Sequence, residues 1–275
     1  MVYDCFSFFN ELDLLELRLN ELDPVIDKFV LVESTRTFQK KAKPLFYNEN
    51  KDRFKDFHHK ITHIIVDKFP TFWSKFRVPK PWDYDTHQKN QVSVALKGCK
   101  PDDVIIFSDL DEIPNPEKIL AYKNIEGFKI FQQRHFYYYL NCVEVEPYDF
   151  TQYKWWYGPV MTHYKNFTSV HELRIQREIN KHPQSIVIPD AGWHFAYIGG
   201  VEKIIQKIES YAHTEHNTSE FKEAERIKKI IESGQSLYGE NMKCVFQRID
   251  QSYPMYLQQN LEKFSWHVFE GGSII

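Results

Sequence analysis

A β-branched apolar run that passes directly into acidic residues constrains the fold of this chain more than any other feature. Residues 104–107 are Val-Ile-Ile-Phe, which predicts a strand buried on both faces of a sheet. Asp109 and Asp111 follow, and Pro114 ends strand pairing. Side chains two positions apart in a strand point the same way, so both carboxylates would lie at the carboxyl end of this strand, where open α/β sheets bind ligands.

The two aspartates are candidate metal ligands. Two carboxylates that point together repel each other unless a positive charge lies between them. A hard divalent cation that also binds a substrate phosphate would supply that charge. The other interpretation is a plain turn, because acidic residues after a strand often form turns or cap the next helix.

The beginning of the chain has the pattern of a parallel β-α-β unit. Residues 2–8 and 29–33 are predicted strands, and between them a helix capped by Asn10 carries four leucines on one stripe. A right-handed crossover brings the loops after both strands to one edge, so Phe9, Asn10 and Glu33 would lie where a nucleotide binds. Glu33 could equally be a solvated strand end.

The rest of the chain alternates helix and strand signals, and then turns to aromatic strands typical of antiparallel pairing. Strands are predicted at 61–67, within 127–141, at 160–164 and at 185–189. Helices are predicted at 86–98, with Asp85 and Gln88 as a capping box, at 201–212, from Asn217 to Gly234 and near 253–257. Residues 37–53 are predicted as a loop and residues 69–82 as irregular. This pattern predicts a mixed central sheet flanked by helices.

The composition excludes some classes of partner. The 275 residues are 42% hydrophobic, which suits one large α/β domain. The net charge of −3 argues against a protein that neutralises nucleic-acid phosphates. No apolar run is long enough to span a membrane and nothing resembles a signal peptide, so we expect a soluble, cytoplasmic chain whose four cysteines are reduced and mostly buried.

Four motifs in one order resemble those of glycosyltransferase family 17. They are DCFSFFNELDLLELRL at residues 4–19, FVLVES at 29–34, DLDEIP at 109–114 and GWHF at 192–195. The resemblance extends over about residues 3–240. It implies a GT-A, Rossmann-like fold in a single domain over 1–275, with a nucleotide-binding half at about 1–114, an acceptor and metal-closing half at about 115–240, and a C-terminal segment at 241–275.

The resemblance also implies a reaction. It is the inverting, metal-dependent transfer of a sugar, N-acetylglucosamine, from a UDP-sugar donor to a glycan or glycoconjugate acceptor. Asp109 and Asp111 look like the family's metal-binding pair, holding Mn²⁺ or Mg²⁺ against the diphosphate and so stabilising the leaving group. His194, or else His213, would complete the coordination; the other interpretation of His194 is a hydrogen-bonded structural residue.

Further donor contacts are implied in the segment before the acidic strand. Asp85, Gln88, Lys89 and Asn90 resemble the family's Glu-x-x-Gln-Arg-Asn stretch, with Asp in place of Glu and Lys in place of Arg. Gln88 and Lys89 join Phe9, Asn10, Glu33 and Asp109 as candidate donor-binding residues. Because a lysine offers a point charge and not a planar fork, a bidentate phosphate contact is not expected at position 89.

An inverting transfer needs a base that takes the proton of the acceptor hydroxyl. The candidates are Glu112, Asp190 and Glu172; we predict Asp190 as the base and Glu112 as a structural or sugar-binding residue. Trp155, Trp156 and Trp193 are candidate acceptor contacts if exposed and core residues if buried.

Two other functions remain open at this stage. The same acid pair would serve a metal-dependent phosphohydrolase or nucleotidyltransferase, and the paired tryptophans would serve a glycan-binding module without catalysis. The animal members of the family carry an amino-terminal membrane anchor that this sequence does not show. We therefore expect a different acceptor, such as a bacterial or viral surface glycan.

Overall fold

The computed structural model describes residues 1–69, 77–146, 148–239 and 241–269. Its strands are β1 Val2–Phe8, β2 Lys28–Ser34, β3 Ile61–Val66, β4 Val104–Asp109, β5 Glu112–Pro114, β6 Lys129–Tyr137, β7 Cys142–Glu146, β8 Asp149–Tyr153, β9 Trp155–His163, β10 Ile186–Ile188, β11 Gly192–Ala196 and β12 Lys243–Phe246. Its helices are α1 Leu12–Leu22, α2 Phe46–Glu49, α3 Pro81–Asn90, α4 Val92–Ala95, α5 Pro116–Tyr122, α6 Val170–Ile175, α7 Gly200–Ser210, α8 Ala224–Ser233 and α9 Met255–Gln259, with 3₁₀ turns η1 Lys51–Phe57, η2 Leu96–Gly98, η3 Tyr164–Asn166, η4 Thr214–His216 and η5 Ser265–His267.

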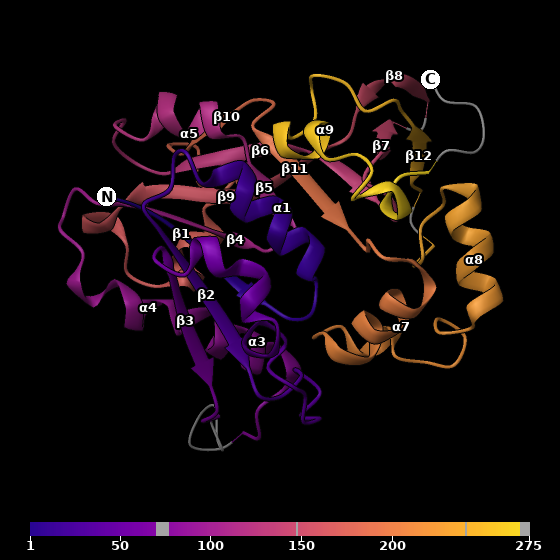
Figure 1. Ribbon diagram of the computed structural model, residues 1–275, viewed down its shortest axis with the longest axis horizontal. Coiled ribbons are helices and arrows are strands. Elements are labelled where there is room, and N and C mark those ends of the chain that lie inside the picture. The colour runs from indigo at the N-terminus through magenta and orange to yellow at the C-terminus, as the bar shows by residue number, and fades with distance from the viewer. Residues whose placement is uncertain (70–76, 147, 240, 270–275) are drawn as a thin grey trace.

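These elements form a mixed, curled sheet with helices on both faces (Figure 1). The strand order is β12-β7-β6-β9-β4-β1-β2-β3, with β5, β8, β10 and β11 attached beside this path. Strands β1 to β4 are parallel to one another, while β9 is antiparallel to both β4 and β6. The predicted α/β class and mixed sheet are confirmed.

The predicted β-α-β unit and the buried acidic strand are also confirmed. β1 pairs with β2 and with β4, so it lies at the centre of the parallel half. β4 lies between β1 and β9 and is buried from Val104 to Ser108. Since β6 and β11 run in the same direction as β4, the carboxyl ends of β1, β4, β6 and β11 lie at one edge of the sheet.

Alternating side chains of the strands build two apolar layers. Phe6 and Ile106 pack on the face covered by α1, together with its leucines. Cys5 and Ile105 pack on the opposite face, against residues of α4, η2 and α6 such as Val92, Leu96 and Leu173. A third cluster joins α7 and α8 to β7 and β12 at the other end of the molecule (Figure 1).

Several predicted helix boundaries are wrong. Helix α3 begins at Pro81 and not at residue 86, because the Asp83 carboxylate accepts a hydrogen bond from the Lys80 N–H at 2.7 Å and so caps the helix earlier than Asp85 would. It ends at Asn90, and the rest of the predicted helix is the short α4 and η2.

Asn10 does not cap α1. Glu11 holds the N-cap position, and the Asn10 side chain instead donates a hydrogen bond to Gln206 of α7 at 3.0 Å. Helix α8 begins at Ala224, where the Glu223 carboxylate caps it, and not at Asn217. Its predicted end at Gly234 is confirmed, because this glycine has the left-handed φ of 63°.

The predicted loop at 37–53 contains α2 and the beginning of η1. Of the segment 69–82 predicted as irregular, residues 70–76 lie outside the described residues, and its last two residues begin α3.

The four cysteines are free, as predicted; Cys5, Cys142 and Cys244 are buried and Cys99 is partly exposed. Within the described ranges, no helix combines the length and the apolar character needed to cross a membrane.

A fully buried guanidinium fixes the turn between β4 and β5. Arg18 of α1 pairs with both carboxylate oxygens of Asp4 at 2.6 and 2.8 Å. Its Nη1 donates to the carbonyl oxygens of Asp109, Leu110 and Glu112 at 3.0–3.1 Å, and its Nη2 donates to Ser108 Oγ at 2.6 Å. One side chain therefore ties α1 and β1 to the acidic turn.

We predict that Arg18→Met lowers the free energy of unfolding by about 3–5 kcal/mol, because it leaves the buried Asp4 carboxylate without its partner. Urea denaturation measures the change. As a control, Arg53→Met removes a partly exposed guanidinium whose partners Glu16 and Asp13 keep other hydrogen-bond donors, so we expect a smaller loss. Equal losses in the two variants would contradict the role given to burial.

Candidate active site

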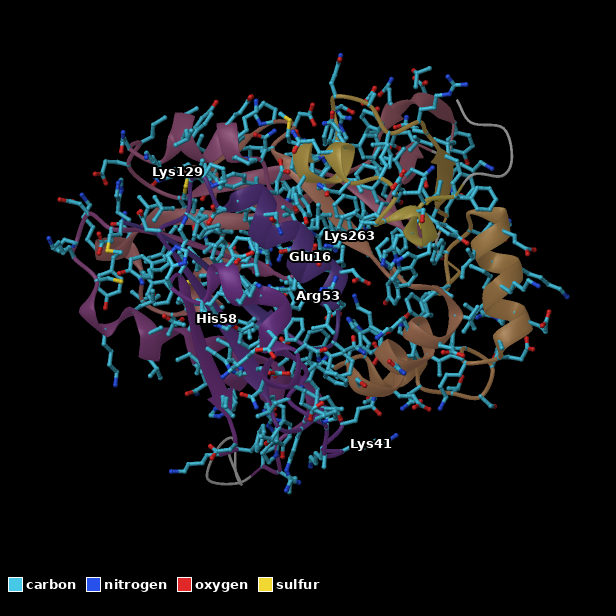
Figure 2. The ribbon with its side chains drawn as sticks, viewed as in Figure 1. Glu16, Lys41, Arg53, His58, Lys129 and Lys263 are labelled. Atoms are coloured by element: carbon cyan, nitrogen blue, oxygen red, sulfur yellow. The ribbon has the colours of Figure 1, made fainter. Side chains whose placement is uncertain are left out.

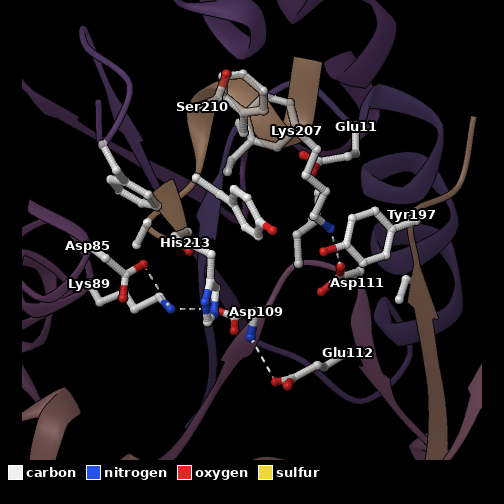
Figure 3. A pocket seen from close by; sticks show the side chains of 18 of the residues that line it. Glu11, Asp85, Lys89, Asp109, Asp111, Glu112, Tyr197, Lys207, Ser210 and His213 are labelled. Carbon is white, nitrogen blue, oxygen red and sulfur yellow. Dashed lines mark hydrogen bonds and ion pairs between the residues drawn. The ribbon is translucent and has the colours of Figure 1, made fainter. Parts of the chain in front are cut away.

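A cavity of about 540 Å³ opens at the shared carboxyl edge of β1, β4, β6 and β11. Its charged lining residues are Glu11, Arg36, Lys43, Asp85, Lys89, Asp109, Asp111, Glu112, Arg174, Arg177 and Lys207. Its aromatic and histidine lining residues are Phe8, Phe9, Phe38, Trp82, His135, Tyr137, Trp156, His194, Tyr197, Tyr211, His213, His216 and Tyr238. Figure 3 shows Asp85 and Lys89 on one side, Lys207, Glu11, Tyr197 and Asp111 on the other, and Asp109 between them.

Asp109 is the last residue of β4 and is held by two cations. Its Oδ1 lies 2.9 Å from Lys89 Nζ, and its Oδ2 lies 3.1 Å from Arg174 Nη1. Burial by itself would raise the pKa of Asp109, but the charges of Arg174, Lys89 and Arg177 outweigh it and hold the pKa well below its usual value. Asp109 is therefore ionised throughout the physiological pH range.

Asp111 lies in the turn after β4 and faces the same cavity. Its Oδ2 is 3.0 Å from Lys207 Nζ, and its Oδ1 is 3.7 Å from His194 Nε2. The prediction that both aspartates meet at one edge agrees with this arrangement. The sequence analysis attributed this arrangement to the alternation of side chains along one strand, and that reason is wrong. β4 ends at Asp109, so the turn after it directs the side chain of Asp111.

His194, in the middle of β11, is a neutral imidazole. Its pKa is well below the usual value because of burial first and then the charges of His135, Lys207 and Arg177. The ring is stacked on His135, with centroids 4.4 Å apart and planes 4° apart. A neutral imidazole has a free lone pair, which is the form that binds a metal ion.

Asp109, Asp111 and His194 have the chemistry of ligands for a divalent cation, although among the described residues the group whose ligand atoms lie within 4.8 Å of one another is His213, Glu215 and His216. Asp109 and Asp111 offer carboxylate oxygens, the donors preferred by Mg²⁺ and Mn²⁺, and His194 offers a neutral nitrogen beside Asp111. Lys89, Arg174 and Lys207 also lie beside these two carboxylates and supply positive charge to them.

The alternative ligand, His213, belongs to a different cluster. Its Nδ1 lies 2.6 Å from Glu215 Oε1, and a ligand atom of each of His213, Glu215 and His216 lies within 4.8 Å of the others around η4. His213 and His216 line the cavity.

Glu112 has a structural position, one of the two roles predicted for it. It is 1% exposed. Its Oε2 accepts a hydrogen bond from the Asp109 N–H at 2.9 Å, and its Oε1 accepts from Trp156 Nε1 at 2.8 Å and from Arg177 Nη2 at 3.0 Å. The carboxylate thus fixes the Asp109 backbone and has both oxygens engaged.

The prediction of Asp190 as the base is wrong by position. Asp190 lies before the amino end of β11, whereas the cavity is at the carboxyl ends of β11 and its parallel neighbour β6. Both carboxylate oxygens pair with Arg134, at 2.9 and 3.0 Å. Glu172, the third candidate, is exposed in the first turn of α6 and is outside the set of described residues that line the cavity.

Two of the predicted donor contacts also lie elsewhere. Asn10 is turned toward Gln206. Glu33 is neither a solvated strand end nor a cavity residue: it is fully buried, accepts a hydrogen bond from the Tyr47 N–H at 3.3 Å, and lies 3.1 Å from His63 and 3.5 Å from Lys43.

The other predicted donor contacts do line the cavity. They are Phe9, Gln88, Lys89 and Asp109. Gln88 also donates to the Val32 carbonyl at 3.1 Å, which ties α3 to β2.

Of the three tryptophans predicted as acceptor contacts, Trp155, Trp156 and Trp193, only Trp156 lines the cavity. Trp193 is 5% exposed and donates to the Ser252 carbonyl at 2.9 Å, so it is a core residue and not an acceptor contact. Trp155 is outside the described lining residues and contacts Tyr153.

The sequence interpretation named Lys89 but missed Arg174, Arg177 and Lys207, the other cations that pair with carboxylates at the acidic turn. Arg174 and Arg177 are three residues apart, a spacing that places two side chains on one helical face and that could have indicated an anion site. Lys207 is one of four charged residues of α7, and nothing in its local pattern distinguishes it from the others.

The fold and cavity define an α/β protein with a charged, anion-attracting site at the carboxyl edge of its sheet. The sequence profile of Glycosyltransferase family 17 matches residues 1–266. The chain therefore belongs to glycosyltransferase family 17, as its motifs predict.

Curated relatives agree with this placement, although each match covers only about a quarter of the relative's own length. The chain is 32% identical, over 133 residues, to the β-1,4-mannosyl-glycoprotein 4-β-N-acetylglucosaminyltransferase of Rattus norvegicus; this segment is 46% of the chain and 24% of the rat enzyme. The corresponding human enzyme is 33% identical over 125 residues, 43% of this chain and 23% of its own length. A galactosyltransferase crystallised with donor and acceptor sugar analogues covers 66% of this chain, and is itself covered to 65%, at 8% identity and a TM-score of 0.35, a likeness too weak to bear on function.

We predict that Trp156→Phe lowers the free energy of unfolding by about 1.5–3 kcal/mol, because it keeps the ring but removes a donor to the buried Glu112 carboxylate. Denaturation in urea measures the loss. Trp155→Phe at the neighbouring position is the control, with an expected change within about 0.5 kcal/mol. A Trp156→Phe protein as stable as the control would contradict the structural role of this hydrogen bond.

Proposed function

We propose that the chain transfers N-acetylglucosamine from UDP-N-acetylglucosamine to a hydroxyl of a glycan acceptor, with inversion at the anomeric carbon. The observation that carries this proposal is the position of Asp109, Asp111 and His194 in one cation-rich cavity, in a member of glycosyltransferase family 17. The names of the rat and human relatives support the choice of the donor sugar.

The side chains of the cavity suit a sugar-linked diphosphate. Lys89 and Arg174 pair with Asp109, and Lys207 pairs with Asp111. A diphosphate bound beside these aspartates would therefore lie near three cationic side chains. Phe9, at the end of β1, offers an aromatic ring at the edge of the parallel half, where nucleotides bind in such sheets.

Asp109, Asp111 and His194 are the residues that would hold Mn²⁺ or Mg²⁺. When bound there, such an ion would supply Lewis-acid stabilisation of the negative charge on the departing diphosphate. Lys89 and Arg174 would add fixed positive charge beside the same group. The rings of His135, Trp156 and His194 pack against one another in the lining of the same cavity.

The acceptor oxygen attacks the anomeric carbon on the face opposite the diphosphate. The bond from that carbon to the phosphate oxygen breaks, its electron pair leaves with UDP, and a base takes the hydroxyl proton.

We predict that UDP-N-acetylglucosamine with Mn²⁺ raises the melting temperature of the protein, because a ligand at 100 times its Kd stabilises the folded state by about 2.7 kcal/mol. EDTA should abolish most of the shift. Asp109→Asn and Asp111→Asn should each abolish the metal-dependent part, while Asp102→Asn, on the exposed loop before β4, should leave it unchanged.

Three outcomes contradict the proposal. Equal shifts with simple phosphoesters, followed by their hydrolysis, indicate a phosphohydrolase or nucleotidyltransferase. Glycan binding that survives Asp109→Asn/Asp111→Asn, with no effect of a UDP-sugar, indicates a binding module. A donor shift that is unaffected by EDTA contradicts the role of the metal.

A further inference from the structure

A second, smaller cavity adjoins the first. Its volume is about 210 Å³, and it is lined by the start of α1, the segment after β11, part of α7 and η5. Glu11, Tyr197 and Lys207 line both cavities, so these three side chains form the wall between them. In Figure 3 they lie together on one side of the main cavity.

The second cavity has the chemistry of a sugar site. Trp266 lines it and is 60% exposed, an unusual position for so large a ring. A flat apolar ring beside polar groups suits a sugar, whose apolar face stacks while its hydroxyls form hydrogen bonds. Asp13, also in the lining, supplies a carboxylate to the same cavity.

The polar groups of this cavity are fixed in place. His267 Nε2 lies 3.0 Å from Asp13 Oδ2, and Arg53 pairs with the same carboxylate. The hydrogen bond from His267 and the pairing with Arg53 lower the pKa of Asp13 to about 2, although burial by itself would raise it. The Trp266 ring is stacked on His267 with centroids 3.6 Å apart, so the tryptophan is held by the residue that anchors the aspartate.

The segment that carries Trp266 is tied to α1. Glu16 of α1 accepts a hydrogen bond from Tyr256 Oη at 2.8 Å and one from Arg53 Nε at 2.8 Å, and it also pairs with Lys263. Figure 2 shows Glu16, Arg53 and Lys263 close to one another. The tryptophan is therefore a preorganised part of the site.

The size and charge of the cavity indicate a single neutral ring. Its volume lies below the range of about 300–1,000 Å³ of pockets for drug-sized ligands. Asp13 is already paired with Arg53 and His267, so the cavity does not require a charged ligand.

Glu11 is distinctive among the carboxylates of the main cavity. Asp85, Asp109, Asp111 and Glu112 each pair with a lysine or arginine. Among the described residues, Glu11 has no such nitrogen within 4.0 Å, and it accepts only from the Asn10 N–H at 3.0 Å. It occupies the N-cap position of α1 without a side-chain capping bond.

Glu11 nevertheless lies near the reacting end of the site. Glu11 and Lys207 both line the wall between the two cavities, and Figure 3 shows them next to each other. Glu11 is therefore close to the lysine that lies 3.0 Å from the proposed metal ligand Asp111.

We propose that the second cavity binds one neutral sugar ring of the acceptor against Trp266, and that Glu11, in the wall between the cavities, is the base. This inference rests on the proposed glycosyl transfer. The acceptor oxygen bonds to the anomeric carbon, the bond from that carbon to the phosphate oxygen breaks with its electron pair leaving on the nucleoside diphosphate, and the hydroxyl proton goes to the Glu11 carboxylate.

The subsite is tested by saturation-transfer NMR with UDP and Mn²⁺ present and the methyl glycosides of mannose, glucose, galactose and N-acetylglucosamine as probes. We predict that the wild-type protein gives a signal for at least one glycoside and that Trp266→Ala reduces it at least fivefold. Tyr148→Ala removes a ring that is 95% exposed elsewhere and should leave the signal unchanged. No signal in the wild type, or equal signals in wild type and Trp266→Ala, overturns the subsite.

The base is tested by Glu11→Gln. We predict that transfer to the glycoside identified above falls by about 10²–10⁴-fold, the usual contribution of a general base, while the Kd for UDP-N-acetylglucosamine changes less than twofold. Glu202→Gln, on the exposed surface of α7, is the control and should keep full transfer. A weaker donor Kd with an unchanged rate at saturation would overturn the assignment, because Glu11 would then be a donor contact.

The two proposals fail in distinguishable ways. If the wild-type protein does not bind UDP-N-acetylglucosamine, the proposed function fails. If it binds the donor but Trp266→Ala and Glu11→Gln both behave like their controls, only the inference of the acceptor site fails. Thermal melts of each variant show whether a loss reflects unfolding.

Discussion

The site depends on one buried cation. A guanidinium has five N–H donors in a fixed plane, and Arg18 directs all of its nitrogens at a carboxylate, a hydroxyl and three carbonyl groups. Those carbonyls belong to the turn that holds both aspartates. Because Arg18 donates hydrogen bonds to three carbonyl oxygens of this turn, it fixes the backbone conformation after β4. Asp109 and Asp111 therefore face the same cavity. A neutral side chain could not satisfy so many buried oxygens at once.

The second constraint is the balance of charge around the two aspartates. Asp109 is paired by cations from α3 and α6, and Asp111 by a cation from α7, so the acidic turn gathers three helices that are far apart in sequence. Cations outnumber carboxylates among the described residues that line the cavity. The cavity therefore attracts an anion even with every carboxylate ionised, which suits a diphosphate.

Sequence patterns predicted those features that depend on near neighbours. The buried run at 104–107, the β-α-β unit and the end of α8 at Gly234 follow from hydrophobic periodicity and the left-handed conformation of glycine. Predictions for Glu33 and Trp193 were wrong because their surroundings are set by distant residues, His63 and Ser252. Burial of this kind results from the packing of the whole chain, and no local pattern encodes it.

Asp190 is close in sequence to the GWHF motif, but it does not lie at the cavity. Asp190 is four residues from His194, which in an extended strand is about 13 Å. Since β11 runs parallel to β6 toward the cavity, four residues back along the chain lead away from it, and a left-handed φ of 44° at Asp190 turns its carboxylate to Arg134. Glu11 is far from the GWHF motif in sequence, yet it follows β1, whose carboxyl end opens into the cavity. Strand direction, more than distance along the chain, decides which acids can reach a substrate.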